Sequence, residues 1–393
     1  MTGAADSHAI ATGKEPAGGR ILSVLVGRTY ELDLRGGADL CDGAFHLRDE
    51  PAYLEDLPYP GRIRPSLLRR DSDGFTFRYC TDLVVQGTVR APRAVRSADV
   101  KLTCSGPDLD IRSDLVVTGD RRVERGRTGA RLSEAVPFEE MPLRYDKAYG
   151  GSDDLAEERH PDLLRAEVMA ALGGAVSDEM GTYSYPRNPA GKGFLVEPDG
   201  LIGLAWPNVE FADAPLSTVD LERLAQPLER WGERPYPAGF DWLPHDWFPR
   251  SAFCGLLPDT HDGRMPEAEV QLGLLRADEG RYPLDDRIHR FAQGAHPFLC
   301  RHRLRGGERL RVTSLGPDGQ DLVVTVPGHR PRVHLSLFGA TEREVDPVLD
   351  RVFVEGDARR LTLLWRATAA AGREHLPPDW EKRCPYRINW GHG

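Results

Sequence analysis

The residue types that could do chemistry occur first around Lys192, in the segment Ala190-Gly191-Lys192-Gly193. A lysine between glycines is part of the loop that cradles phosphates in nucleotide-binding proteins. That loop also needs a Ser or Thr directly after the lysine, because its hydroxyl binds magnesium, and a further glycine upstream. Here Gly193 follows the lysine, and Pro186 stands where the upstream glycine is required. The sequence therefore favours a tight turn with an exposed lysine over a phosphate site.

A second candidate is the group Asp241, His245 and Asp246, which could bind a metal or act as acid and base in a hydrolase. Zinc sites usually draw a further His or Cys at a defined spacing, and no such spacing is found. The pattern favours a surface histidine flanked by tryptophans, and a metal-dependent hydrolase remains the alternative. No G-x-S-x-G or H-E-x-x-H motif is present. The sequence predicts a protein that is not an enzyme, without catalytic residues, cofactor or bound metal.

The strongest patterns are four segments rich in glycine, proline and aromatic residues. Gly150-Gly151 allows backbone angles that other residues resist, and Asn188-Pro189 favours a turn. Trp, Tyr and Arg are enriched where proteins contact partners, but buried aromatic residues are also ordinary core material. Two interpretations stay open: these residues contact a partner, or they only hold two β-regions together. The candidates are Arg144, Tyr145, Tyr149, Gly150, Gly151, Asn188, Pro189, Gly191, Lys192, Gly193, Phe194, Asn208, Glu210, Phe240, Trp242, Trp247 and Arg250.

Composition places these segments in a globular, strand-rich chain. The 393 residues are 40% hydrophobic and 28% charged, and suit two or three domains. Glycine and proline number 41 and 31, or 72 together, against about 47 at average usage. The excess predicts many turns and few long helices. The formal net charge of −10 argues against nucleic-acid binding, which usually needs a basic face.

The expected compartment follows from the ends and the cysteines. The N-terminal residues have no apolar run typical of a signal peptide, and no segment approaches the roughly 20 apolar residues that span a bilayer. The six cysteines are scattered without a Cys-x-x-Cys spacing, so neither a zinc ribbon nor a redox pair is indicated. We expect a reduced, cytoplasmic protein without a membrane span.

Short β-branched and aromatic runs between turn residues predict antiparallel strands. Near the C-terminus, Leu361, Leu363 and Trp365 alternate with Thr362 and Arg366, which predicts one buried and one wet face. Helical spacing is confined to residues 153–174 and to a short segment from Ser217. The strands are expected at Ile21–Arg35, Phe75–Tyr79, Leu83–Val89, Val100–Leu102, Leu115–Val117, Arg309–Leu315, Asp321–Pro327, Arg332–Gly339, Arg351–Gly356 and Arg360–Ala367.

These elements predict a mainly β fold with sandwich-like sheets and a long irregular middle. The expected organisation has five parts. They are a disordered lead-in (1–20), an N-terminal β-rich domain (21–140), an irregular central region with short helices (141–255), a C-terminal β-sandwich-like region (256–370) and a tail (371–393).

In this order, four motifs resemble a bacterial domain-of-unknown-function family found beside type VI secretion genes. They are MPLRYDKAYGG (141–151), NPAGKGF (188–194), WPNVE (206–210) and PAGFDWLPHDWFPR (237–250), and the resemblance extends over residues 20 to 370. The segment Cys254–Asp259 departs from the family pattern, so the resemblance implies nothing about binding by that loop.

The resemblance implies a non-enzymatic adaptor or chaperone. Studied members of the family load toxic effectors onto the secretion spike. The expected partners are therefore the N-terminal region of a secreted effector and, beyond it, the spike protein, with protein–protein contacts and no nucleic acid. A structural component of a larger assembly is the second alternative, beside the hydrolase.

Overall fold

The computed structural model describes residues 7–14, 20–41, 47–48, 50–54, 67–74, 78, 80–153, 184–185, 187–196, 198–218, 234–245, 247, 250, 293–299, 303–373 and 375–391. Strands dominate this part of the chain, and the helices within it are short 3-10 turns. No helix in these ranges is long and apolar enough to cross a membrane. The prediction of a mainly β fold is confirmed.

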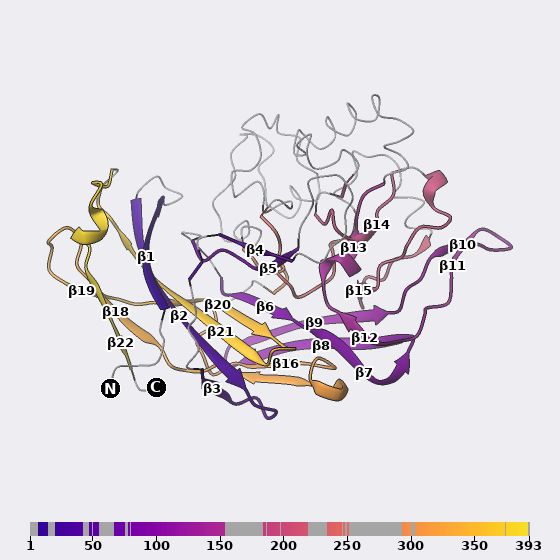
Figure 1. Ribbon diagram of the computed structural model, residues 1–393, viewed down its shortest axis with the longest axis horizontal. Helices are drawn as coiled ribbons and strands as arrows, with labels where there is room; N and C mark the ends of the chain where they lie inside the picture. Colours follow the sequence, from indigo (N-terminus) through magenta and orange to yellow (C-terminus); the bar gives the residue numbers. More distant parts are fainter. Residues whose placement is uncertain are drawn as a thin grey trace, which may run out of the picture.

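A six-stranded sheet joins strands from both ends of the sequence (Figure 1). Its longest pairing runs between β2 and β21, from Ile21↔Ala370 to Glu31↔Arg360, and is antiparallel. The β6–β20 pairing is parallel. The sheet order is β1 (Ser7–Lys14), β2 (Arg20–Leu32), β21 (Arg360–Ala370), β20 (Val348–Glu355) and β6 (Asp82–Gln86), with β3 (Ala38–Leu40) beside β2.

A five-stranded antiparallel sheet lies across the first. Its centre is the hairpin of β8 and β9, which pair from Ser97↔Thr118 to Gly106↔Leu109. The order is β15 (Val209–Phe211), β9 (Leu109–Thr118), β8 (Ser97–Gly106), β16 (Arg309–Val312) and β17 (Leu322–Thr325). β15 is thus the last strand on one side of the sheet.

Smaller elements extend the two sheets. A three-stranded sheet of β19 (Arg343–Val345), β18 (Pro331–Leu335) and β22 (Tyr386–Trp390) lies at one end of the molecule, and β13 to β15 lie towards the other (Figure 1). The remaining pairs are β4 (Ala52–Tyr53) with β5 (Leu68–Arg70), β7 (Thr88–Val95) with β12 (Phe138–Pro142), β10 (Val123–Arg125) with β11 (Ala130–Leu132), and β13 (Tyr149–Gly150) with β14 (Lys192–Gly193). The 3-10 turns are η1 (Tyr145–Lys147), η2 (Pro198–Gly200), η5 (Pro317–Gly319) and η6 (Trp380–Arg383).

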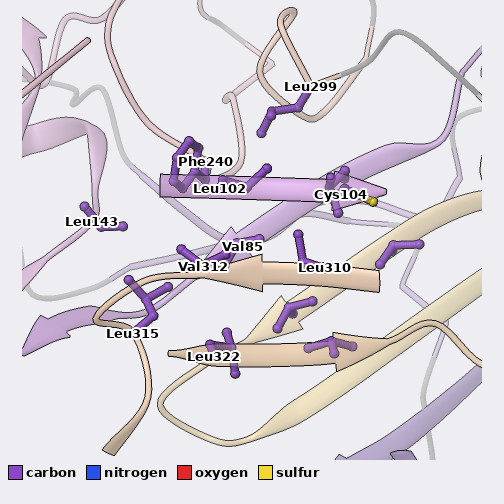
Figure 2. Packing of buried hydrophobic residues seen from close by; sticks show 14 of the residues in the cluster. Val85, Leu102, Cys104, Leu143, Phe240, Leu299, Leu310, Val312, Leu315 and Leu322 are labelled. Carbon is purple, nitrogen blue, oxygen red and sulfur yellow. The ribbon is translucent and has the colours of Figure 1, made fainter. Parts of the chain in front are cut away.

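The main core fills the space between the two large sheets. Val85 of β6 packs there with Leu102 of β8 and Val312 of β16, and Phe240 closes one side (Figure 2). Further along the same face of the six-stranded sheet, Leu22, Val24 and Val26 form a second cluster with Val333 and Leu335 of β18. The opposite face carries Leu25, which packs with Leu364. Because the sheet is covered on both faces, β2 is buried along nearly its whole length.

Several expectations differ from the observed structure. Residues 7–14, expected in a disordered lead-in, form β1 against β2. The expected wet face of the Leu361–Arg366 segment is wrong, because Thr362 and Arg366 are 5% and 3% exposed. Thr362 lies 3.4 Å from the hydroxyl of Thr29, and Arg366 pairs with Asp350, so both polar side chains are satisfied inside.

The β-rich ranges 21–140 and 256–370 both contribute strands to each of the two large sheets, so among the described residues these sheets do not separate into two regions of the sequence. The strand predicted at 75–79 and the helix predicted at 153–174 lie wholly or mostly outside the described residues, as does the helix expected after Ser217.

Candidate functional site

The first two sequence motifs form one unit of structure. β12 ends at Pro142, η1 follows at Tyr145–Lys147, and β13 then pairs in parallel with β14 of the second motif. The paired residues are Tyr149↔Lys192 and Gly150↔Gly193. Tyr145 and Tyr149 are both buried, at 0% and 2% exposure. Two segments some forty residues apart in sequence are thereby held side by side.

Asn188 locks this unit by its side chain. Its Nδ2 donates to the backbone carbonyls of Tyr145 and Tyr149, at 2.8 and 2.9 Å. Gly150 has a φ of +148°, and a Cβ there would lie 2.1 Å from the Asn188 carbonyl oxygen. Only glycine fits such an approach. Pro189, Gly151 and Gly191 complete the same turn, where the Gly151 N–H donates to the Asn188 carbonyl.

The third motif docks on this unit through polar contacts. Lys192 Nζ donates to Asn208 Oδ1 at 2.8 Å, and Asn208 Nδ2 donates to Asp120 Oδ1 at 3.0 Å. The bond from Asn208 is the main cause that lowers the pKa of Asp120. Partial burial, followed by the charge of Lys147, lowers the pKa of Lys192. The lysine is thus a partly buried structural contact rather than the exposed turn residue that the sequence favours.

Glu210 of the same motif pairs with Arg121 at 2.5 Å. Its second carboxylate oxygen accepts the Leu216 N–H at 3.0 Å. Arg144 is 22% exposed at its side chain and binds Asp146 with two nitrogens, each at 3.0 Å. These charged residues are neutralised by near neighbours and order the surface loops around the motifs.

The aromatic candidates lie in the interior. Phe240 and Trp242 are fully buried, Trp247 is 1% exposed, and Phe194 is 3% exposed. The Trp247 ring meets Tyr145 edge-on with centroids 5.6 Å apart. A partner would therefore meet the surface that these rings support rather than the rings themselves.

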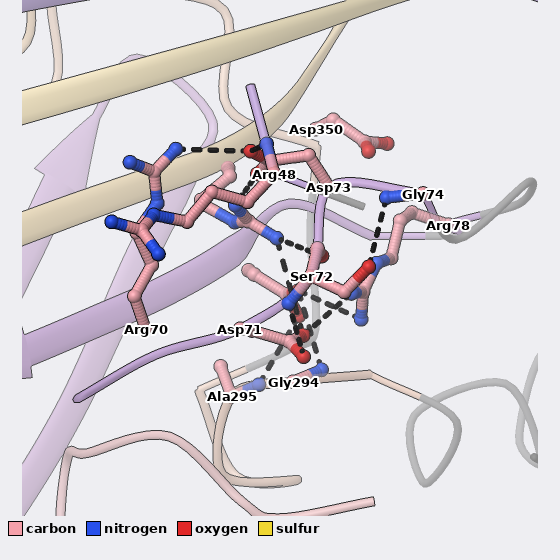
Figure 3. Close-up of polar contacts among 12 residues, drawn as sticks. Arg48, Arg70, Asp71, Ser72, Asp73, Gly74, Arg78, Gly294, Ala295 and Asp350 are labelled. Carbon is pink, nitrogen blue, oxygen red and sulfur yellow. Dashed lines mark hydrogen bonds and ion pairs between the residues drawn. The ribbon is translucent and has the colours of Figure 1, made fainter. Parts of the chain in front are cut away.

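Arg250, the last motif residue, belongs to a buried ion network that sequence reasoning missed. It donates to Asp71 Oδ2 at 2.6 Å, and Arg78 binds the same carboxylate at 2.9 Å. Burial acts to raise the pKa of Asp71, but Arg250, His245 and Arg78 together hold it well below its usual value. Figure 3 shows how Asp71 and its neighbours converge. Other members of the network are Arg70, Asp73, Asp82, Asp350, Arg351 and Arg366.

The residues of the hydrolase alternative have separate surroundings. Asp241 is 3% exposed, and burial raises its pKa to about 7. Its Oδ1 accepts bonds from Gln86 and from the Trp242 N–H, whereas His245 pairs with Asp71 at 2.5 Å. Asp246 lies outside the described residues. Within the described ranges, no three His, Cys, Asp or Glu residues gather as a metal would require.

Beside the motif unit lies an open groove of about 760 Å³. Of the candidate residues named from the sequence, Tyr149 and Glu210 line it. Its other walls come from β9, from the chain after β15, and from the segments around Tyr236 and Phe298. The sequence offered one signal for it, the cluster of aromatic residues between 206 and 248. Phe298 carries no comparable signal, because it is brought there by the fold alone.

The fold and the site together define a strand-rich protein in which glycine-rich motifs form a buried frame beside an open groove. The chain belongs to the family described as "uncharacterized protein conserved in bacteria" (DUF2169), whose sequence model matches residues 17–366. No curated protein and no solved structure matches the chain.

Proposed function

We propose that the chain is a non-enzymatic, cytoplasmic adaptor that binds a type VI secretion effector and helps to load it onto the spike. The observation that carries the proposal is the groove of about 760 Å³ beside the motif unit. Grooves with aromatic walls are common sites of partner binding. The four motifs that resemble the secretion-associated family build the frame of this groove.

The contacts within the frame also support binding rather than catalysis. The polar motif residues Asn188, Asn208 and Glu210 each hold backbone or side-chain groups of the protein itself. Such a frame keeps a surface in a fixed shape, which lowers the entropic cost of binding a partner.

The experiment is affinity purification of the tagged chain from its own host under secretion-active conditions. Recovery of a spike protein, or of a toxin encoded beside it, supports the adaptor. Deletion of the gene should then abolish secretion of that toxin while the toxin still accumulates inside the cell. A folded chain that is recovered without either partner, or unimpaired secretion in the deletion strain, would refute the proposal. Permanent stoichiometric association with the secretion apparatus would instead favour the structural-component alternative.

A further inference from the structure

The groove is built from segments that are far apart in sequence. Arg112 to Asp114 of β9 form one wall, and the chain from Phe211 to Leu216 forms the next. Pro235, Tyr236, Ala238 and Phe298 complete it. Apart from Tyr149, Val209 and Glu210, these residues lie outside the first three motifs. The groove therefore has its own chemistry, which the buried frame does not determine.

Aromatic rings line the groove on its inner side. Phe298 is 38% exposed, although it lies 5.6 Å from Phe211 and 5.9 Å from Tyr236 between ring centroids. Beneath it, buried His296 accepts the Phe298 N–H at Nδ1 and donates from Nε2 to the Pro237 carbonyl. Phe298 is thus held in place while more than a third of its surface stays accessible. Fixed, accessible aromatic rings are suited to an apolar side chain from a partner.

The rim of the groove carries an excess of negative charge. Arg112 pairs with Asp110 at 2.9 Å, and Glu210 pairs with Arg121 at 2.5 Å, so these charges are compensated within the protein. Asp114 and Asp213 are exposed, and neither has an ion-pair partner among the described residues. Asp114 also acts on the charge of Arg112, but the rim has more carboxylates than cations, and exposed carboxylates without a salt bridge beside an apolar surface favour a cation at this position in the partner.

The backbone at the groove favours an extended partner. β15 is the last strand of its sheet, and the Ala212 N–H donates to Asp114 while the Asn208 carbonyl accepts from Thr118. In an antiparallel pair, the residues between such bonded positions direct their backbone groups away from the neighbouring strand. The N–H of Phe211 therefore points away from β9, on the side where Ala148 bridges Val209. The protein itself uses part of this side, through that bridge and through the Phe211 carbonyl, which accepts the Ala214 N–H. The Phe211 N–H is the backbone donor that an extended partner could bond there.

We propose that this groove binds an extended peptide segment of the partner that carries a large apolar side chain and a Lys or Arg within about three residues of it. The apolar side chain packs on Phe298, Phe211 and Tyr236, and the basic side chain pairs with Asp114 or Asp213. That the partner is a secretion effector rests on the proposed function; the chemistry of the bound peptide does not.

The test uses the full chain and a displayed library of random twelve-residue peptides. We expect enrichment of peptides with a large apolar residue near Lys or Arg, and a synthetic peptide of the enriched sequence serves as the probe. Phe298→Ser and Asp213→Lys should each weaken its binding at least about tenfold, as expected for central contacts. A probe with Glu in place of its basic residue should bind Asp213→Lys better than the wild type.

The matched control is Glu139→Lys, an exposed charge reversal at a different surface hollow, which should leave probe binding unchanged. No enrichment, enrichment of acidic peptides, or equal binding by wild type, Phe298→Ser and Asp213→Lys would overturn the inference. Circular dichroism of each variant shows that it is folded. If a variant does not fold, Phe298→Leu and Asp114→Lys replace it.

The same variants separate this inference from the proposed function. If Phe298→Ser and wild type recover the same effector from the host, the groove proposal fails and the adaptor stands. If the groove binds the probe but no effector or spike protein is recovered from the host, the adaptor fails and the peptide site stands.

Discussion

Asp241 gives the sharpest test of the electrostatics inside the motif region. Burial raises the pKa of this carboxyl from 3.8 to about 7, against the opposing hydrogen bonds from Gln86 and the Trp242 N–H. Both donors bind Oδ1, at 2.7 and 2.6 Å. The substitution Asp241→Asn therefore keeps an acceptor for both bonds and removes only the possibility of a buried charge.

The sign of the expected effect follows from proton binding. A carboxyl whose pKa is higher in the folded than in the unfolded state takes up a proton on folding. Its contribution to stability is present at low pH and is lost as the pH rises through the folded pKa. Since a tenfold change in proton affinity is about 1.4 kcal/mol, raising the pKa from 3.8 to about 7 corresponds to about 4 kcal/mol. Roughly 3 kcal/mol of this falls between about pH 5 and about pH 8.

The assay is urea denaturation of wild type and Asp241→Asn across that pH range. Between pH 5 and pH 8, the free energy of unfolding of the variant should rise by about 3 kcal/mol relative to that of the wild type. Asp213→Asn, at an exposed carboxyl, is the control and should show no comparable change. A difference between variant and wild type that stays constant with pH, or that shrinks as pH rises, would refute the reasoning.

Three further substitutions test the contacts of the frame. Asp71→Asn should lower the free energy of unfolding by about 3–5 kcal/mol near neutral pH, because it leaves buried Arg250 without its carboxylate. Because the pKa of Asp71 is depressed, this loss should diminish as the pH falls through that pKa, and a loss in urea titrations that does not change with pH would contradict this. Gly150 and Gly203 both have positive φ, but a Cβ at Gly150 would meet a backbone oxygen at 2.1 Å, whereas one at Gly203 would have no atom within 4 Å. Gly150→Ala should therefore lower the melting temperature more than Gly203→Ala, and equal shifts would show that the close approach is relieved. Asn188→Ala should lower the free energy of unfolding by about 1–3 kcal/mol, because it removes two hydrogen bonds to buried carbonyls, of which that of Tyr145 keeps the Ala148 N–H. Denaturant midpoints within error of the wild type would contradict this.

Local patterns in the sequence predicted individual strands well. The run Ile21–Arg35 contains most of β2, and the expected strand Arg332–Gly339 contains most of β18, in which Val333 and Leu335 are buried and Arg332 is exposed. These signals are local, because side-chain direction along a strand follows directly from position in the chain. They depend on no contact with distant residues.

Pairing between strands was not predictable in the same way. β6 lies beside β20 in parallel, with Asp82 opposite Arg351 across 269 positions of sequence. The alternation in β21 predicts that Arg366 faces solvent, yet its ion pair with Asp350 allows it to be buried. In both cases the deciding contact comes from a remote segment, and the single sequence carries no sign of it.

The position of the motifs explains why the sequence marked the frame more clearly than the groove. A glycine is required where a Cβ would strike backbone, as at Gly150, and an amide is required where buried carbonyls need a donor, as at Asn188. Such demands fix the residue type and so leave a readable motif. An exposed groove residue such as Phe298 or Asp213 meets no such demand from the fold. Residues at the groove can therefore change without cost to the frame, as the adaptor proposed above would require.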